Sequence, residues 1–189
     1  MQYKMSFFLT AMGQFLVSFT ALMGVYYMMT RFNQVAGFSY QEVLLCFGTM
    51  TMAFSLAEGF GRGFDAFPQM IGNGEFDRAL VRPRGVVFQV LAAKMDFSRM
   101  GRVIQAIIVF CYAIPASGIV WTADKVLTLI LMVVFGSLVF FGLFMIYAAF
   151  SFFTLEGLEF MNVFTDGGRE FGRYTFAVYG DGVLRFLTY

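Results

Sequence analysis

Three long stretches without a charged residue dominate the pattern of apolar and polar positions along the chain. They cover residues 5–30, 103–123 and 126–154. A helix needs about 20 mainly apolar residues to cross a hydrocarbon layer roughly 30 Å thick. Each stretch meets this requirement, so the pattern predicts at least three membrane-spanning helices.

A shorter uncharged window lies between Glu42 and Glu58. A helix over residues 40–60 would hold both carboxylates at the depth of the lipid headgroups, and we expect it to be a further span. Residues 126–166 are too long for one crossing, because at 1.5 Å per residue a helix would extend about 60 Å. A turn near residues 150–156 would divide this stretch into two spans.

The sequence therefore predicts an all-α integral membrane protein with a single membrane domain over residues 1–189. A loop over residues 61–102 would follow the second span, and an amphipathic, glycine-rich segment over residues 168–189 would lie at the outer interface. The five predicted spans cover about residues 6–29, 40–60, 103–122, 126–148 and 152–167.

Basic residues are concentrated in the loop between the second and third predicted spans. The linkers 31–42 and 121–125, on the other side of the membrane, hold one basic residue each. Because basic residues favour the cytoplasmic side, we expect the loop and the N-terminus to be cytoplasmic, with Trp121 as an anchor at the outer interface. The basic residues of the loop are Arg62, Arg78, Arg82, Arg84, Lys94, Arg99 and Arg102.

Composition agrees with a membrane protein and excludes several kinds of function. Hydrophobic residues make up 59% of the chain and charged residues only 13%, against about 25% charged in soluble domains. The chain has no histidine, which excludes histidine-based catalysis and histidine metal sites. Cys46 and Cys111 lie alone in separate apolar stretches, so their spacing predicts neither a disulfide framework nor a metal site.

The loop has a local pattern of its own. Gly72 to Glu75 form a turn signal, and residues 76–81 are expected to form a short amphipathic helix that Pro83 ends. Apolar residues from Val86 onward predict a second helical piece. From residue types alone, a docking element and a solvated connector on the membrane surface are equally compatible with this pattern.

The order of residues in the loop resembles the permease subunits of ABC type-2 exporters, in particular a bacterial subfamily. The central motif is Gly74-Glu75-Phe76-Asp77-Arg78-Ala79-Leu80-Val81-Arg82-Pro83-Arg84. Three further motifs also match the family: Arg62-Gly63-Phe64-Asp65, Trp121-Thr122 and Gly167-Gly168-Arg169-Glu170. The resemblance covers nearly the whole chain.

The resemblance implies a six-helix permease in the bacterial cytoplasmic membrane, of which this chain would lack the last helix. It implies a dimer of permease subunits, identical or different, that moves substrate outward by alternating access. A separate ABC ATPase would bind ATP and Mg, and nucleic acid is not an expected partner. The chain has no phosphate-binding loop of the Gly-x-x-x-x-Gly-Lys-Ser/Thr type, and we expect it to bind no cofactor itself.

The resemblance also implies roles for particular residues. Short re-entrant helices on the outer side would begin at residues 167–170, which are Gly167, Gly168, Arg169 and Glu170. Relatives usually carry Tyr-Pro where this chain has Tyr179-Gly180, so the shape of that outer turn would differ. The coupling helix that touches the ATPase would comprise Glu75, Phe76, Asp77, Arg78, Leu80, Arg82, Pro83 and Arg84.

Other interpretations of these features remain. Glu156 and Glu159 share a helix face and are candidates for an intramembrane polar site, although pairing with loop arginines or solvation explains them more simply. Gly59, Gly61 and Gly63 are interpreted as a bend at a helix end, not as a nucleotide-binding loop. The alternative functions are a membrane scaffold, a lipid-modifying enzyme and a stand-alone channel. The chain shows no catalytic set that an enzyme would need.

Overall fold

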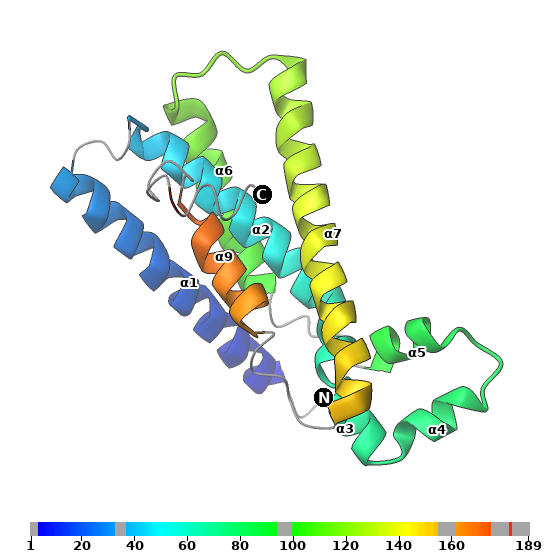
Figure 1. Ribbon diagram of the computed structural model, residues 1–189. Helices are drawn as coiled ribbons and strands as arrows, with labels where there is room; N and C mark the ends of the chain where they lie inside the picture. Colours follow the sequence, from blue (N-terminus) through cyan, green and yellow to red (C-terminus); the bar gives the residue numbers. More distant parts are fainter. Residues whose placement is uncertain (1–3, 33–36, 94–99, 155–161, 175–181, 183–189) are drawn as a thin grey trace.

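A bundle of long helices forms the body of the protein, and shorter helices gather at one end of it (Figure 1). The computed structural model describes residues 4–32, 37–93, 100–154, 162–174 and 182. The long helices are α1 (Lys4–Phe32), α2 (Tyr40–Asp65), α6 (Met100–Ala116) and α7 (Ala123–Thr154).

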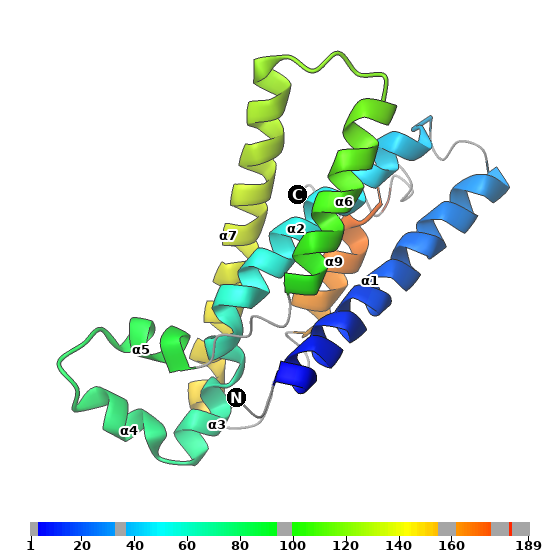
Figure 2. The ribbon, with the colours of Figure 1, turned by 180° about the vertical axis from the view of Figure 1, so that it is seen from behind.

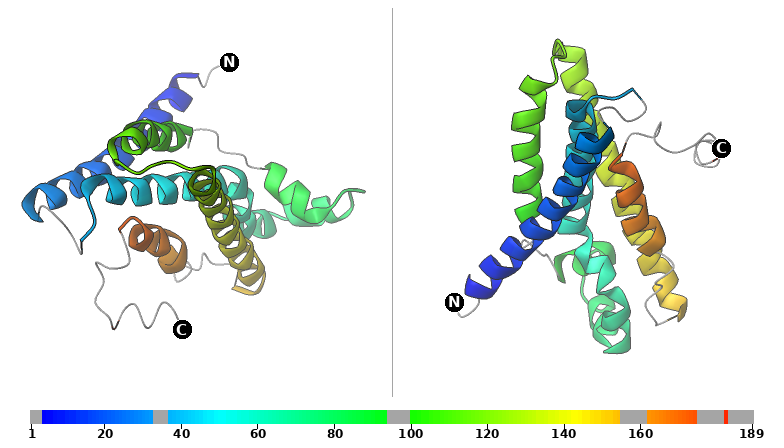
Figure 3. Two further views of the ribbon diagram at one scale, coloured as in Figure 1. Left: turned by 90° about the horizontal axis from the view of Figure 1, so that it is seen from above. Right: turned by 90° about the vertical axis from the view of Figure 1, so that its left-hand side faces the viewer.

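Helix α2 is the centre of the bundle. It packs against α1, α6 and α7 and also against short helices α5 (Val86–Ala93) and α9 (Gly168–Gly172). Seen from above, α6 and α9 lie on opposite sides of α2 (Figure 3). Of its most apolar stretch, 61% of residues are buried, against 11% for α1 and for α7. The two outer helices therefore turn most of their apolar side chains away from the protein, as lipid-facing helices do.

Two clusters of buried apolar residues hold the bundle together. The first joins α2 to α7 through packed aromatic rings: the Phe54 and Phe140 ring centres are 5.1 Å apart, edge to face. The second joins α1, α2 and α6 around Phe47, which is fully buried. Each cluster thus fixes one side of α2.

The predicted all-α class is confirmed, and within the described residues three helices are long and apolar enough to cross a membrane: α1, α2 and α7. Helix α6 has 17 residues and ends at Ala116, earlier than the predicted residue 122. It contains Pro115 near its end, and Gly118 then adopts the left-handed conformation with φ of +64°, which ends a helix. The indole N–H of Trp121 folds back and donates to the Ile114 carbonyl at 3.0 Å.

Helix α7 differs from the sequence prediction. It runs without interruption for 32 residues to Thr154, so the chain does not turn at residue 150, and the predicted limits of spans four and five at residues 148 and 152 do not hold. The reason is that residues 148–154 contain neither proline, glycine nor charge to end a helix. Glu156 and Glu159, which were expected near this turn, lie outside the described residues.

The two ends of the bundle are different in kind. The start of α1, the end of α7 and three of the short helices lie at one end, and the connection from α6 to α7 lies at the other (Figures 1 and 2). These three are α3 (Phe67–Gly72), α4 (Glu75–Leu80) and α5. The segment predicted as a cytoplasmic loop therefore forms a compact helical unit at one end, which we call the loop unit.

Candidate partner-binding loop

The loop unit is fixed to the bundle through a close approach of backbones. Gly63 lies in α2, and a Cβ atom added there would overlap the Val90 carbonyl of α5. A Cβ atom added at Gly61, two residues earlier in α2, would lie 3.0 Å from the Phe144 ring of α7. Both glycines lie near the end of α2, which continues to Asp65. They make room for α5 and α7.

This close approach makes a prediction for Gly63→Ala. The added methyl group should force α5 away from α2 and destabilise the protein by about 1–3 kcal/mol, the usual cost of overpacking. Trypsin should then cleave faster after Arg84, in the turn that α5 helps to hold. Gly59→Ala is the matched control, because nothing lies within 4 Å of a Cβ atom at Gly59. Equal cleavage and melting of the two variants would contradict the account.

A turn at Asn73 and Gly74 ends α3 and changes the direction of the chain before α4. The Asn73 N–H donates to the Gln69 carbonyl at 3.0 Å and the Gly74 N–H to the Ile71 carbonyl at 3.0 Å, which closes α3. Gly74 then has φ of +69°, a left-handed conformation that favours glycine. Helix α4 begins at Glu75, so the predicted turn and the short helix after it are both present.

Phe76 anchors α4 to the bundle. Its ring lies edge to face against Phe67 of α3, with centres 5.2 Å apart, and against Phe152 of α7, with centres 5.9 Å apart. No sequence signal pointed to Phe152, because it stands in a continuous apolar run. The contact makes the last turns of α7 part of the support of α4.

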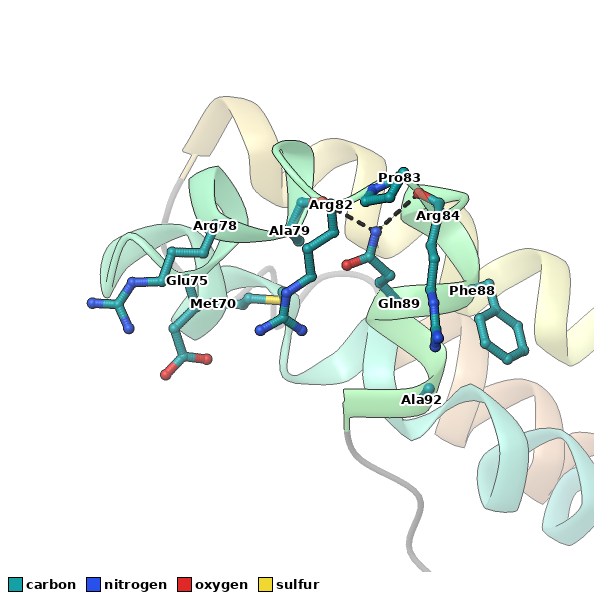
Figure 4. Close-up of a pocket in the computed structure, with 10 residues that line it drawn as sticks. All are labelled: Met70, Glu75, Arg78, Ala79, Arg82, Pro83, Arg84, Phe88, Gln89 and Ala92. Atoms are coloured by element: carbon teal, nitrogen blue, oxygen red, sulfur yellow. Dashed lines mark hydrogen bonds between the residues drawn. The ribbon is translucent and has the colours of Figure 1, made fainter.

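Gln89 of α5 holds the turn that follows α4. Its side-chain amide donates to the Ala79 carbonyl at 3.0 Å and to the Arg84 carbonyl at 2.9 Å, as Figure 4 shows. The Arg84 N–H donates to the Arg82 carbonyl at 2.8 Å within the turn itself. A single polar residue within the apolar run 86–91 was the only sequence signal for this role.

The outer face of α4 and its turn combines apolar and basic side chains. Leu80 is 55% exposed and Val81 86% exposed. Phe76, by contrast, packs against Phe67 and Phe152 on the side of the bundle. We call Leu80, Val81 and the nearby arginines Arg78, Arg82 and Arg84 the outer face.

Beside the outer face lies an open hollow of about 800 Å³ between α4 and α5 (Figure 4). Three arginines and one carboxylate line it, so its potential favours an acidic partner. The charged side chains of α4 and its turn have no ion pair within the described part of the chain. The residues lining the hollow are Met70, Glu75, Arg78, Ala79, Arg82, Pro83, Arg84, Phe88, Gln89 and Ala92.

The second predicted site segment, residues 167–170, lies against α2. Gly167 ends a short π-helix, η2 (Val163–Gly167), and Gly168 begins α9. The Arg169 guanidinium carbon is 4.6 Å from the centre of the Phe54 ring, in the middle part of α2. Arg169 also pairs with Glu170 at 3.0 Å. The segment therefore lies along the body of the bundle.

These observations define a class of protein: a helical membrane protein with a compact loop unit at one end. A family model described as "ABC-2 family transporter protein" matches residues 15–189, and the chain belongs to that family. This confirms the resemblance found in the sequence. Neither a search of curated proteins nor a search of solved structures found a match. Membership makes the chain the membrane component of an ABC transporter, which has its ATP-binding site on a separate ABC ATPase.

Proposed function

We propose that the chain is the permease subunit of an ABC exporter and that residues 75–84 form its coupling helix. The observation that carries the proposal is the outer face of α4, where Leu80 and Val81 are exposed beside three arginines. An exposed apolar pair close in sequence to basic side chains suits a protein interface better than it suits water. The ATPase surface that receives it would be apolar at its centre and acidic around it.

The contacts behind the outer face support a coupling role. Phe76 joins α4 to α7 through Phe152, and Gly63 joins α2 to α5 by direct backbone packing. A displacement of α4 by a partner would thus reach two helices of the bundle. Because packed side chains transmit rigid displacements, the loop unit could pass motion of the ATPase to α2 and α7.

The orientation follows from charge. The end of the bundle with the loop unit carries most of the basic residues, whereas the opposite end carries Arg31 and Lys125. The N-terminus and the loop unit would therefore lie in the cytoplasm, and the membrane would be the bacterial cytoplasmic membrane. ATP and Mg would bind to the partner chain.

Transport itself would take place between two permease subunits, identical or different, by alternating access in the outward direction. The family and the resemblance support this arrangement. A scaffold, a channel or a lipid-modifying enzyme would not require a surface that binds an ATPase. Whether the outer face binds the ATPase therefore distinguishes a permease from these alternatives.

The test uses the full chain and the ABC ATPase encoded beside it, co-expressed and purified in detergent. In the variant Asp77→Ala/Arg78→Ala/Arg82→Ala, the ATPase should no longer co-elute, because the charged rim of the interface is lost. The matched control is Asp124→Ala/Lys125→Ala, at the opposite end of the bundle, which should co-elute like the wild type. Co-elution of the triple variant would contradict the proposed site.

A further inference from the structure

Polar side chains line the interface between α1, α2 and α6, starting at the end near the loop unit. Arg102 of α6 contacts the Glu58 carboxylate of α2 at 2.8 Å and also bonds to the Gln14 amide oxygen of α1. The side chains of Arg102 and Glu58 are 12% and 7% exposed. This group ties three helices together at the edge of the bundle.

The polar row continues into the bundle. With increasing distance from the loop unit, residue numbers rise in α1 and α6 and fall in α2 (Figure 1). One turn further along, Ser18 follows Gln14, Ser55 precedes Glu58 and Gln105 follows Arg102; Thr51 lies one more turn along α2. Their exposed fractions are only 2–3%. We call these four residues, Ser18, Thr51, Ser55 and Gln105, the polar seam.

Side chains of the polar seam differ from other polar side chains in the same helices. Thr20 donates its hydroxyl to the Leu16 carbonyl at 3.0 Å, and Thr49 donates to the Leu45 carbonyl at 2.7 Å. Such bonds within a helix satisfy a hydroxyl group in an apolar environment. Each of the four side chains of the polar seam, by contrast, has no hydrogen-bond partner among the residues that the structure describes.

An apolar cluster closes the far end of the seam. Beyond Thr51, the same three helices meet through Val25 of α1, Phe47 of α2 and Val109 of α6, all 5% exposed or less. Buried polar groups without a partner are costly, and lipid supplies none. Water does so in protein interiors, each molecule making about three hydrogen bonds.

We propose that the polar seam binds water molecules, which enter from the end near the loop unit past Arg102 and reach as far as Thr51. The seam is a hydrated crevice within one chain, closed toward the outer side by the apolar cluster. This inference goes beyond the proposed function, because it requires no ATPase and no second permease subunit.

The test measures the reactivity of single cysteines in a chain that carries Cys46→Ala and Cys111→Ala. The thiolate is the reactive form of cysteine, and burial in dry, apolar surroundings disfavours it. The Ser55→Cys variant in membranes should react with 2-aminoethyl methanethiosulfonate at least about tenfold faster than the Ala57→Cys variant. Ala57 is the matched control, since it lies two residues further along α2, is 3% exposed and belongs to the apolar cluster with Phe54.

Equal, slow reaction of the two variants would overturn the proposal. Ser18→Cys, on α1, reports on the same seam and serves where Ser55→Cys does not fold. A second change separates a hydrated seam from accidental access by the reagent. Adding Gln105→Leu to Ser55→Cys removes hydrogen-bonding groups at similar volume and should slow the reaction several-fold, whereas an unchanged rate would contradict water binding at Gln105.

Discussion

The variant Leu80→Asp/Val81→Asp is expected to lose the ATPase almost completely. Burying a leucine or valine side chain contributes about 1.5–3 kcal/mol, and about 1.4 kcal/mol corresponds to a tenfold change in affinity. Losing two such side chains from an interface core should therefore weaken binding roughly 100-fold or more. The fold should not change, because both side chains are more than half exposed in the free chain.

The measurement is the dissociation constant of the ATPase from the purified permease, together with the melting temperature of the permease alone. Val120→Asp is the control, since Val120 is 75% exposed in the connection at the opposite end. It should leave the affinity unchanged. If the double variant bound the ATPase as the wild type does, Leu80 and Val81 would instead contact the membrane surface or water.

The second large effect is expected for Arg102→Met. This change removes the guanidinium from the buried Glu58 carboxylate and from Gln14, where α1, α2 and α6 meet. Breaking a buried ion pair by removing one partner costs about 3–5 kcal/mol. The variant should melt far below the wild type in detergent and give a low yield of monodisperse protein.

The control for this prediction is the double variant Glu58→Gln/Arg102→Met. It removes both charges, so it should regain much of the stability that Arg102→Met loses. Melting temperatures of the wild type, both single variants and the double variant form a complete cycle. Purely additive losses would show that the pair does not contribute as a unit.

The sequence predicted the central part of the molecule well, because its signals there are local. Helix α2 starts at Tyr40, as expected from a window whose carboxylates lie near its ends. The turn at Gly74 and the helix that follows depend on backbone preferences of neighbouring residues, so they too could be predicted. The family resemblance is confirmed by the match over residues 15–189.

The limits of the later spans could not be predicted from hydropathy. A long apolar run indicates that a segment lies in lipid, but it does not indicate where the segment turns. The predicted fourth span ends at residue 148, yet α7 continues through Thr154. The packing of Arg169 over the Phe54 ring in the body of the bundle is likewise a contact between helices that hydropathy does not encode.

Features that depend on several helices at once were also missed. Ser18, Ser55 and Gln105 stand in three separate apolar stretches, where each looks like an isolated polar residue. Only the antiparallel packing of α2 against α1 and α6 aligns them in one seam. The separation of Phe76 from Leu80 and Val81 likewise follows from the position of Phe152, a tertiary contact that no spacing in the loop encodes.

The most direct test of the coupling role is photo-cross-linking in the assembled transporter. A benzoylphenylalanine placed at Val81 should form a cross-link to the ATPase, whereas the same probe at Val120, similarly exposed at the opposite end, should form none. A cross-link from Val120, or none from Val81 in a complex that co-purifies with its ATPase, would contradict the assignment of the outer face as the ATPase-binding surface.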